Sequence, residues 1–294
     1  MKYRVTHATT YTYGETVPLC QNFVHLTPRK VPGQRCLYHR LLVRPTPSTT
    51  SRRLDYFGNP VTVSSVSRGH HRLLVRAISK LEVQPRAPLD LAHSPSWEAV
   101  RDGLALDRSR HGLDVYQFLF DSPHVARSTE LKDYARPSFP PGRPLLAAVL
   151  DLTARIHAEF RYDPQATTID TPVSEVLRQR RGVCQDLAHL QIGCLRSLGL
   201  AARYVSGYLR THPPAGQPRL VGADASHAWL AVFCGPLDWI DLDPTNKLVP
   251  SDEHMTIAWG RDYSDVCPIQ GMFVGGGRHA MTTAVEVLPL EEPR

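Results

Sequence analysis

The first 85 residues consist of short β-rich runs separated by turn sequences, and this pattern limits the fold more than any other. The runs include YRVTHATTYTY, CLYHRLLVRP and NPVTVSSVS, with VPG, TPSTTS and FGNP between such runs. Runs of β-branched and aromatic residues bounded by Gly, Pro and Ser clusters are typical of strands. Their spacing, about ten to fifteen residues, predicts a small antiparallel sandwich or barrel-like domain.

Helical patterns and then further strands follow in the rest of the chain. A proline-bearing linker, QPRAPLDLAHSPS, precedes short helical segments such as SWEAVRDGLAL. The clearest long helix is predicted in RPLLAAVLDLTARIHAEF, where Leu145, Val149 and Leu152 share one side. Strand patterns return in ARYVSGYL, HAWLAVF and DWIDLDP and continue near the C-terminus. We therefore expect an N-terminal β-rich domain at 1–85, a linker with short helices at 86–143, a core at 144–250, and a C-terminal β segment at 251–294 that packs on the core or on the N-terminal domain.

The composition is that of an ordinary globular protein. Hydrophobic residues make up 42% and charged residues 21% of the 294 residues. The sequence contains no apolar run of about 18 residues, the length that a membrane-spanning helix needs. The N-terminal segment lacks the apolar stretch of a secretory signal. These features predict a cytoplasmic protein with no membrane partner.

The net charge of +6 raises the question of a nucleic-acid partner. The charges are dispersed along the chain, and no basic stripe carries interleaved aromatic residues. Net charge by itself describes association and solubility, not a binding site. We therefore expect no nucleic-acid partner.

The pattern of cysteines and histidines gives no metal-binding signature. The six cysteines are scattered without a CxxC pair, which argues against a zinc ribbon or a disulfide framework. No HExxH sequence occurs, and His70 and His71 have no Glu or Cys at ligand spacing. Glycine-rich nucleotide-binding loops are also absent from the sequence. The expectation is a protein with free thiols, no metal and no cofactor.

Cys184 stands at the predicted start of a helix in the segment RRGVCQDLAHLQIGCLRSLGL. Leu187, Leu190 and later apolar residues recur at helical spacing, and Gly182 interrupts whatever precedes them. Asp186 falls in the first turn, where a carboxylate favours the exposed N–H groups. A helix N-terminus favours the thiolate form of a cysteine and so makes it a better nucleophile. The alternative is a small buried side chain, since free cysteines are among the most buried residues.

A second segment, SHAWLAVFCGPLDWIDLDPTN, reads as a β-hairpin around Gly and Pro. If Phe233 and Trp239 bracket the turn, His227 and Asp243 lie on one face as a diagonal cross-strand pair. A carboxylate would then orient an imidazole, as a catalytic triad requires. Asp241 has the same strand parity, so the geometry leaves both carboxylates open. His227 could equally be an ordinary structural histidine.

These segments together resemble the core of the transglutaminase-like superfamily. The resemblance rests on GVCQDLAHL, DASHAWLAVF and WIDLDPTN, in the order Cys, His, Asp with separations of 43 and 16 residues. It implies a papain-like α+β fold in which a cysteine at a helix N-terminus packs on an antiparallel sheet. Carried over residue by residue, Cys184 would be the nucleophile, His227 the base and Asp243 the orienting carboxylate. The match to Asp-Pro-Thr favours Asp243 over Asp241.

The resemblance extends over most of the chain outside residues 86–140. The segments YRVTHATTYTY, LTPRKVPGQ and DYFGNPV are similar to the β-rich N-terminal domain of bacterial transglutaminase-like proteins. DEHMTIAWGRDYSDVCPIQGMFVGGGRH resembles their C-terminal segment. The family's oxyanion partner suggests Tyr162, in FRYD, as a candidate. Because no clustered acidic loop of the EF-hand type occurs, we expect no calcium requirement.

The resemblance implies acyl transfer at amide bonds through a cysteine thioester. The expected reaction is hydrolysis of a peptide or isopeptide bond in a protein or peptide substrate. One alternative is protein-glutamine γ-glutamyl transfer, in which a primary amine replaces water. A second alternative is an interaction scaffold that keeps the fold without turnover. In a third, the N-terminal β domain is the functional part and binds a partner, and the core serves it.

Overall fold

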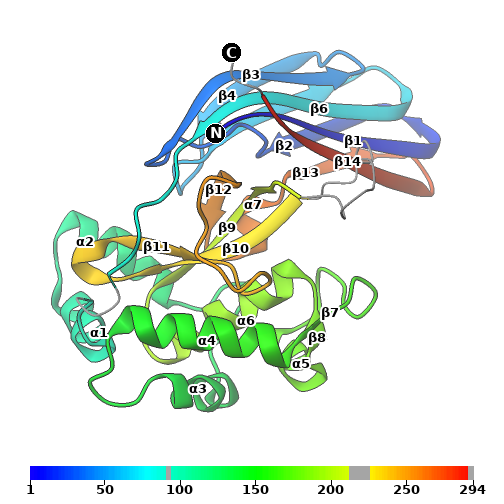
Figure 1. Ribbon diagram of the computed structural model, residues 1–294. Helices are drawn as coiled ribbons and strands as arrows, with labels where there is room; N and C mark the ends of the chain where they lie inside the picture. The colour runs from blue at the N-terminus through cyan, green and yellow to red at the C-terminus, as the bar shows by residue number, and fades with distance from the viewer. Residues whose placement is uncertain (91–93, 212–225, 291–294) are drawn as a thin grey trace, which may run out of the picture.

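The computed structural model describes residues 1–90, 94–211 and 226–290. These residues form an α+β fold in which a β-sandwich, a four-stranded sheet and a layer of helices lie one below another (Figure 1). Residues 91–93 of the predicted linker and the first two residues of the DASHAWLAVF segment lie outside the described residues. No helix among those described is long and apolar enough to cross a membrane.

Two antiparallel sheets of four described strands make up the sandwich. Their orders are β14-β1-β6-β3 and β13-β2-β5-β4. The strands are β1 (Lys2–Val17), β2 (Leu19–Val24), β3 (Gln34–Arg44), β4 (Thr49–Leu54), β5 (Pro60–Val66), β6 (His70–Val83), β13 (Ile269–Val274) and β14 (His279–Pro289). Tyr3 and Val5 are buried while Arg4 between them is exposed, which is the alternation of a strand with one buried face.

Strand β4 was not expected, because its first residues belong to TPSTTS, which the sequence presents as a turn. All six of its side chains are exposed, and it pairs only with β5 at the edge of its sheet. An edge strand with no buried face has no apolar alternation that could reveal it in the sequence.

The C-terminal segment contributes to both parts of the molecule. Strand β12 (His254–Gly260) pairs with β9 (Ala202–Leu209) in the core sheet. After the short helix α7 (Tyr263–Val266), β13 and β14 each add a strand to one sheet of the sandwich. Strand β14 pairs with β1 from Tyr3 opposite Pro289 to Tyr13 opposite His279. The sandwich is therefore built from the two ends of the chain, blue and red in Figure 1.

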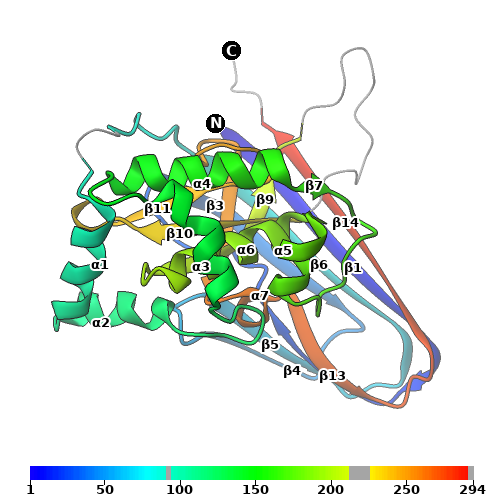
Figure 2. The same ribbon diagram turned by 90° about the horizontal axis from the view of Figure 1, so that it is seen from below.

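The core sheet has the order β11-β10-β9-β12 and holds the predicted hairpin. Its other strands are β10 (Ser226–Phe233) and β11 (Trp239–Leu242). The helices are α1 (Trp97–Leu106), α2 (Arg110–Tyr116), α3 (Thr129–Ala135), α4 (Leu145–Glu159), α5 (Val173–Gln179) and α6 (Cys184–Ser197), with 3₁₀ turns at Gln117–Leu119, Arg136–Ser138 and Gly235–Leu237. Figure 2 views the helical layer from below, with α3, α4, α5 and α6 close together.

Helix α6 lies at the centre of the core. It packs against β9 and β10 on one side and against α3, α4 and α5 on the other. Every residue from Asp186 to Arg196 is buried. A helix enclosed on all sides needs apolar residues around most of its circumference, and the sequence supplies them. This burial fixes the position of the helix start, where Cys184 stands.

Candidate active site

Cys184 is the first residue of α6, and the chain approaches it through a short parallel β-bridge. Strand β8 (Arg181–Gly182) pairs with β7 (Arg161–Tyr162), with Tyr162 opposite Gly182. Val183, the N-cap residue, is extended. The first N–H groups of a helix have no acceptor within the helix, so they point past Cys184 as donors.

The Asp186 side chain holds the first turn of α6 in place. Its Oδ2 accepts hydrogen bonds from the backbone N–H of Val183 at 2.8 Å and from Thr167 Oγ1 at 2.6 Å. Burial raises the pKa of the Asp186 carboxyl, and these two hydrogen bonds oppose the increase. A Cβ on Gly182 would lie only 2.7 Å from Asp186 Oδ2. The glycine is therefore needed for this close approach.

His227 and Asp243 meet at the end of the core sheet. The hairpin register pairs Phe233 with Trp239, as the sequence predicts. His227 Nε2 and Asp243 Oδ2 are 2.7 Å apart. Asp241 lies opposite Ala231, farther along the sheet, and forms no hydrogen bond with the imidazole among the described residues. The structure thus separates the two carboxylates that strand parity left open.

Hydrogen bonds from the same imidazole reach both the carboxylate and the thiol. Burial lowers the pKa of His227, but hydrogen bonds to Asp243 and to Cys184 outweigh it and raise the pKa to about 10. Because Nε2 faces Asp243, Nδ1 is the nitrogen available to Cys184. At neutral pH the imidazole is therefore protonated between a carboxylate and a sulfur.

Asp243 is fully buried and accepts several further hydrogen bonds. Asn246 donates from Nδ2 at 2.7 Å and from its backbone N–H at 3.2 Å, and the Thr245 N–H donates at 3.0 Å. Burial alone would raise the pKa of Asp243, but the hydrogen bonds, largest from His227 and His254, hold it well below its usual range. The Asp-Pro-Thr-Asn segment therefore forms a turn, and the donors of that turn hold the Asp243 carboxylate in position.

His254 is a member of this cluster that the sequence did not single out. Its Nε2 lies 3.1 Å from Asp243 Oδ2, and its ring packs edge-on against Trp229 with centroids 5.2 Å apart. Strands β11 and β12 stand at opposite edges of the sheet, so the connection between them crosses the ends of β10 and β9. That crossing brings His254 to Asp243, and no local sequence pattern records it.

The cluster around Asp243 has the composition of a possible metal site. Its nitrogen and oxygen atoms, from His227, Asp243 and His254, all lie within 4.8 Å of one another. In the structure the two imidazoles are hydrogen-bonded to the carboxylate. The same atoms therefore already have partners within the protein.

Tyr162 lies close to Cys184 and is 53% exposed. Burial of part of its ring raises the pKa of Tyr162, and the nearby Cys184 and Asp186 raise it further. The side chain is thus near the thiol and open to solvent on one side. Its role at the oxyanion stays a prediction.

Two other residues of α6, Cys194 and His189, pack in the interior. Cys194 is fully buried. His189 is also buried, and its Nε2 accepts a hydrogen bond from the backbone N–H of Tyr263 at 3.1 Å. Burial lowers the pKa of His189 to about 3, so its ring is neutral.

Comparisons with known proteins agree with both parts of this fold. Residues 3–82 match the bacterial transglutaminase-like N-terminal region, and residues 132–244 match the transglutaminase-like superfamily. An uncharacterized protein of Mycobacterium tuberculosis strain H37Rv is 40% identical over 299 residues, covering 99% of this chain and 93% of the relative. An uncharacterized protein of Mycobacterium leprae is 31% identical, with 98% of each chain covered.

A solved structure has the same fold over the whole chain. It is the crystal structure of "a Putative Cysteine Protease from Cytophaga hutchinsonii", with a TM-score of 0.77 and 22% identity, covering 100% of this chain and 92% of that one. The similarity therefore includes the sandwich as well as the core. The chain belongs to the transglutaminase-like superfamily and carries the bacterial transglutaminase-like N-terminal region.

Proposed function

We propose that this protein hydrolyses peptide or isopeptide bonds through a thioester on Cys184. Membership of the superfamily supports the general class, thiol-dependent acyl transfer. The observation that carries the proposal is the hydrogen-bonded chain from Cys184 through His227 to Asp243 at the start of α6. Such a hydrogen-bonded Cys-His-Asp arrangement supplies a nucleophile, a proton carrier and an orienting carboxylate.

In the first half-reaction, the Cys184 proton resides on His227, and the thiolate attacks the amide carbonyl carbon. The C–S bond forms as the carbonyl π electrons move onto oxygen. His227 then donates its proton to the departing amine, the C–N bond breaks, and an acyl thioester remains. In the second half-reaction, His227 takes a proton from water, the hydroxide attacks the thioester, and the acid leaves as Cys184 is restored.

The oxyanion of each step needs hydrogen-bond donors. The backbone N–H of Cys184, in the first turn of α6, is one proposed donor. The Tyr162 hydroxyl is the candidate side-chain donor. Removing one such donor from an enzyme commonly costs about 3–4 kcal/mol in the barrier.

The first test is the alkylation of each cysteine by iodoacetamide at about pH 6, followed by peptide mass mapping. An ordinary thiol, with a pKa near 8.5, is almost fully protonated at that pH and reacts slowly. We expect Cys184 to react at least about tenfold faster than Cys36, which is exposed. His227→Ala should remove this advantage, and the control His71→Ala, at an exposed position of the sandwich, should keep it.

If Cys184 reacts no faster than Cys36, the free protein contains no activated nucleophile and the proposal fails. Fast alkylation would justify a second test with a peptide library, with and without methylamine. Cleaved peptides that depend on Cys184 support hydrolysis. Methylamine incorporation without cleavage would replace hydrolysis with transamidation.

A further inference from the structure

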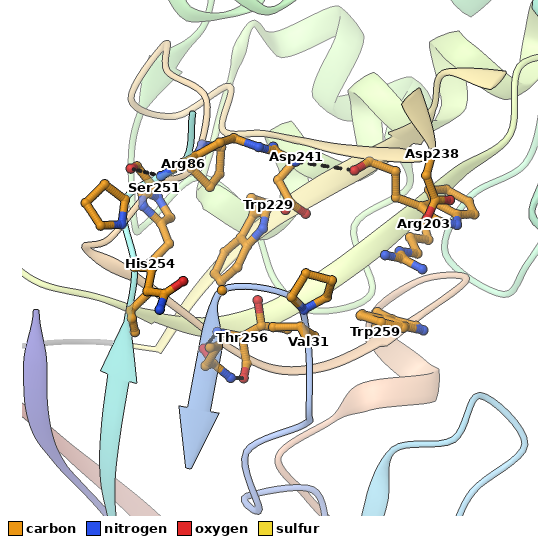
Figure 3. A pocket seen from close by; sticks show the side chains of 18 of the residues that line it. Val31, Arg86, Arg203, Trp229, Asp238, Asp241, Ser251, His254, Thr256 and Trp259 are labelled. Carbon is orange, nitrogen blue, oxygen red and sulfur yellow. Dashed lines mark hydrogen bonds between the residues drawn. The ribbon is translucent and has the colours of Figure 1, made fainter. Parts of the chain in front are cut away.

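A cavity of about 450 Å³ lies between the sandwich and the core sheet, on the sheet face opposite α6. The core sheet contributes Trp229, Trp239 and Trp259 to its wall, and the N-terminal domain contributes Val31 and its neighbours (Figure 3). Cys184, His227 and Asp243 are not among the lining residues, but His254, which contacts Asp243, is, so the cavity adjoins the candidate active site without containing its nucleophile. Its size and its position between domains are typical of small-molecule sites.

Arg203 is the buried charge in this wall. Its guanidinium lies between two indole rings, 3.6 Å from the centroid of Trp259 and 4.1 Å from that of Trp239. Only 9% of the residue is exposed, and its Nε has no hydrogen-bond partner among the described residues. Cation–π contacts offset part of the cost of burying this charge, but they supply no acceptor for the N–H groups.

Arg86 brings a second unpaired donor to the same cavity. The residue follows β6 in the chain, and its backbone N–H donates to Ser251 Oγ at 3.1 Å. Its Nη2 lies 3.5 Å from the Trp239 carbonyl oxygen, whereas Nη1 is buried without a partner among the described residues. Two guanidinium groups with unpaired donors therefore border one cavity.

The acidic groups of the wall do not satisfy these donors. The Asp241 carboxylate attracts both Arg203 and Arg86 electrostatically, yet the structure records no hydrogen bond from either guanidinium to it among the described residues. Asp238 is two-thirds exposed and lies 3.9 Å from His111. Since buried N–H donors are nearly always satisfied in native proteins, an acceptor from outside the chain fits the two arginines.

We propose that this cavity binds a small molecule that carries a carboxylate and an apolar body. The carboxylate would accept hydrogen bonds from Arg86 and Arg203, because guanidinium groups match its planar geometry. The apolar body would lie against the tryptophans and the Val31 side of the wall. The proposal does not rest on the proposed function, and its test measures binding without turnover.

The test uses tryptophan fluorescence of the full chain, because three of its four tryptophans line the cavity. Trp97→Phe removes the fourth, and the protein is titrated with N-acetyl-L-leucine, N-acetyl-L-phenylalanine and the corresponding neutral amides. We expect saturable changes with the acids and at least about tenfold weaker binding of the amides, since hydrogen bonds to charged groups contribute about 1.5–3 kcal/mol.

Arg86→Gln and Arg203→Gln should each weaken binding of the acids by about tenfold or more. The control Arg4→Gln, at an exposed position on β1, should bind as the parent does. Arg86→Gln keeps the test valid if Arg203→Gln does not fold. The proposal is overturned if neither acid binds at millimolar concentration, if acids and amides bind equally, or if Arg86→Gln binds as tightly as the parent.

Discussion

At the scale of single residues, Asp243 organises the candidate site. One fully buried carboxylate accepts hydrogen bonds from two imidazoles, an amide side chain and two backbone N–H groups. Buried charges are stable only when they are paired and hydrogen-bonded, so each donor helps to keep Asp243 ionised. The ionised carboxylate in turn keeps the proton on His227.

His254 is therefore expected to act as a positioning residue through Asp243. His254→Ala removes one donor and should slow alkylation of Cys184 at pH 6 by about threefold to tenfold. His254→Gln can still donate to Asp243 and should restore most of the rate. The matched control is His111→Ala, which removes an exposed histidine from α2. Equal rates for His254→Ala and the parent would show that His254 has no such role.

The His227–Asp243 pair should make stability depend on pH in a defined direction. The pKa of His227 is raised to about 10, so its contribution is complete below about pH 6.5 and is lost as pH rises toward 10. The pKa of Asp243 is lowered, so its contribution is lost as pH falls below its ordinary value, about 4. We expect the stability difference between the parent and His227→Gln, from urea unfolding, to shrink steadily from pH 7 to pH 10. A difference that grows over this range would contradict the assignment.

At the scale of secondary-structure elements, the start of α6 and the loop after β11 decide the geometry. The helix start is fixed by a parallel β-bridge before Cys184 and by the Asp186 side chain after it. The loop after β11 crosses the end of the sheet and carries Asp243 to both histidines. Both features place functional groups at the end of a rigid, buried element, where small displacements are resisted.

Asp186→Ala should therefore loosen the helix start. The substitution leaves the Val183 N–H without its acceptor, and we expect a loss of about 1–2 kcal/mol in the free energy of unfolding by urea. The Cys184 alkylation rate should fall as well. The control is Glu130→Ala, which removes an exposed first-turn carboxylate from α3 and should cost no more than about 0.5 kcal/mol. Equal losses for the two variants would mean that Asp186 is not a specific support.

At the scale of the whole molecule, the two ends of the chain are joined in the sandwich. Strands β13 and β14 cover one edge of β2 and one edge of β1. The core sheet is completed by β12, the strand before them in the chain, with only the short helix α7 between. The N-terminal domain thus depends on residues more than 180 positions away from its own last strand.

A chain that ends at Pro268 should consequently lose the ordered sandwich. Removing β13 and β14 exposes unpaired edges along β1 and β2, and such edges promote association between chains. We expect aggregation in size-exclusion chromatography and faster hydrogen exchange at β1 and β6. A synthetic peptide of residues 269–290, added in excess, should reverse part of both effects. A monomeric truncated chain with protected β1 amides would contradict this expectation.

The sequence by itself determined the features that depend on local periodicity and on short motifs. It predicted β1 as a strand, the long helix α4, the cysteine at the start of α6 and the register of the hairpin, because burial on one face imposes a period of two or 3.6 residues. Together with the family resemblance, it also predicted the α+β fold. Strand β4 was not predicted from the sequence because no face of it is buried.

Only the tertiary structure decided which distant residues meet. The second histidine on Asp243, the pairing of β14 with β1 and the arginines of the interdomain cavity all come from contacts between distant or non-neighbouring segments. Neither strand parity nor spacing distinguishes Asp241 from Asp243; the path of the chain does, because it carries Asp243 past the sheet end while Asp241 stays within β11. Side-chain periodicity reports which face an element buries, whereas the packing of whole elements decides which faces come together.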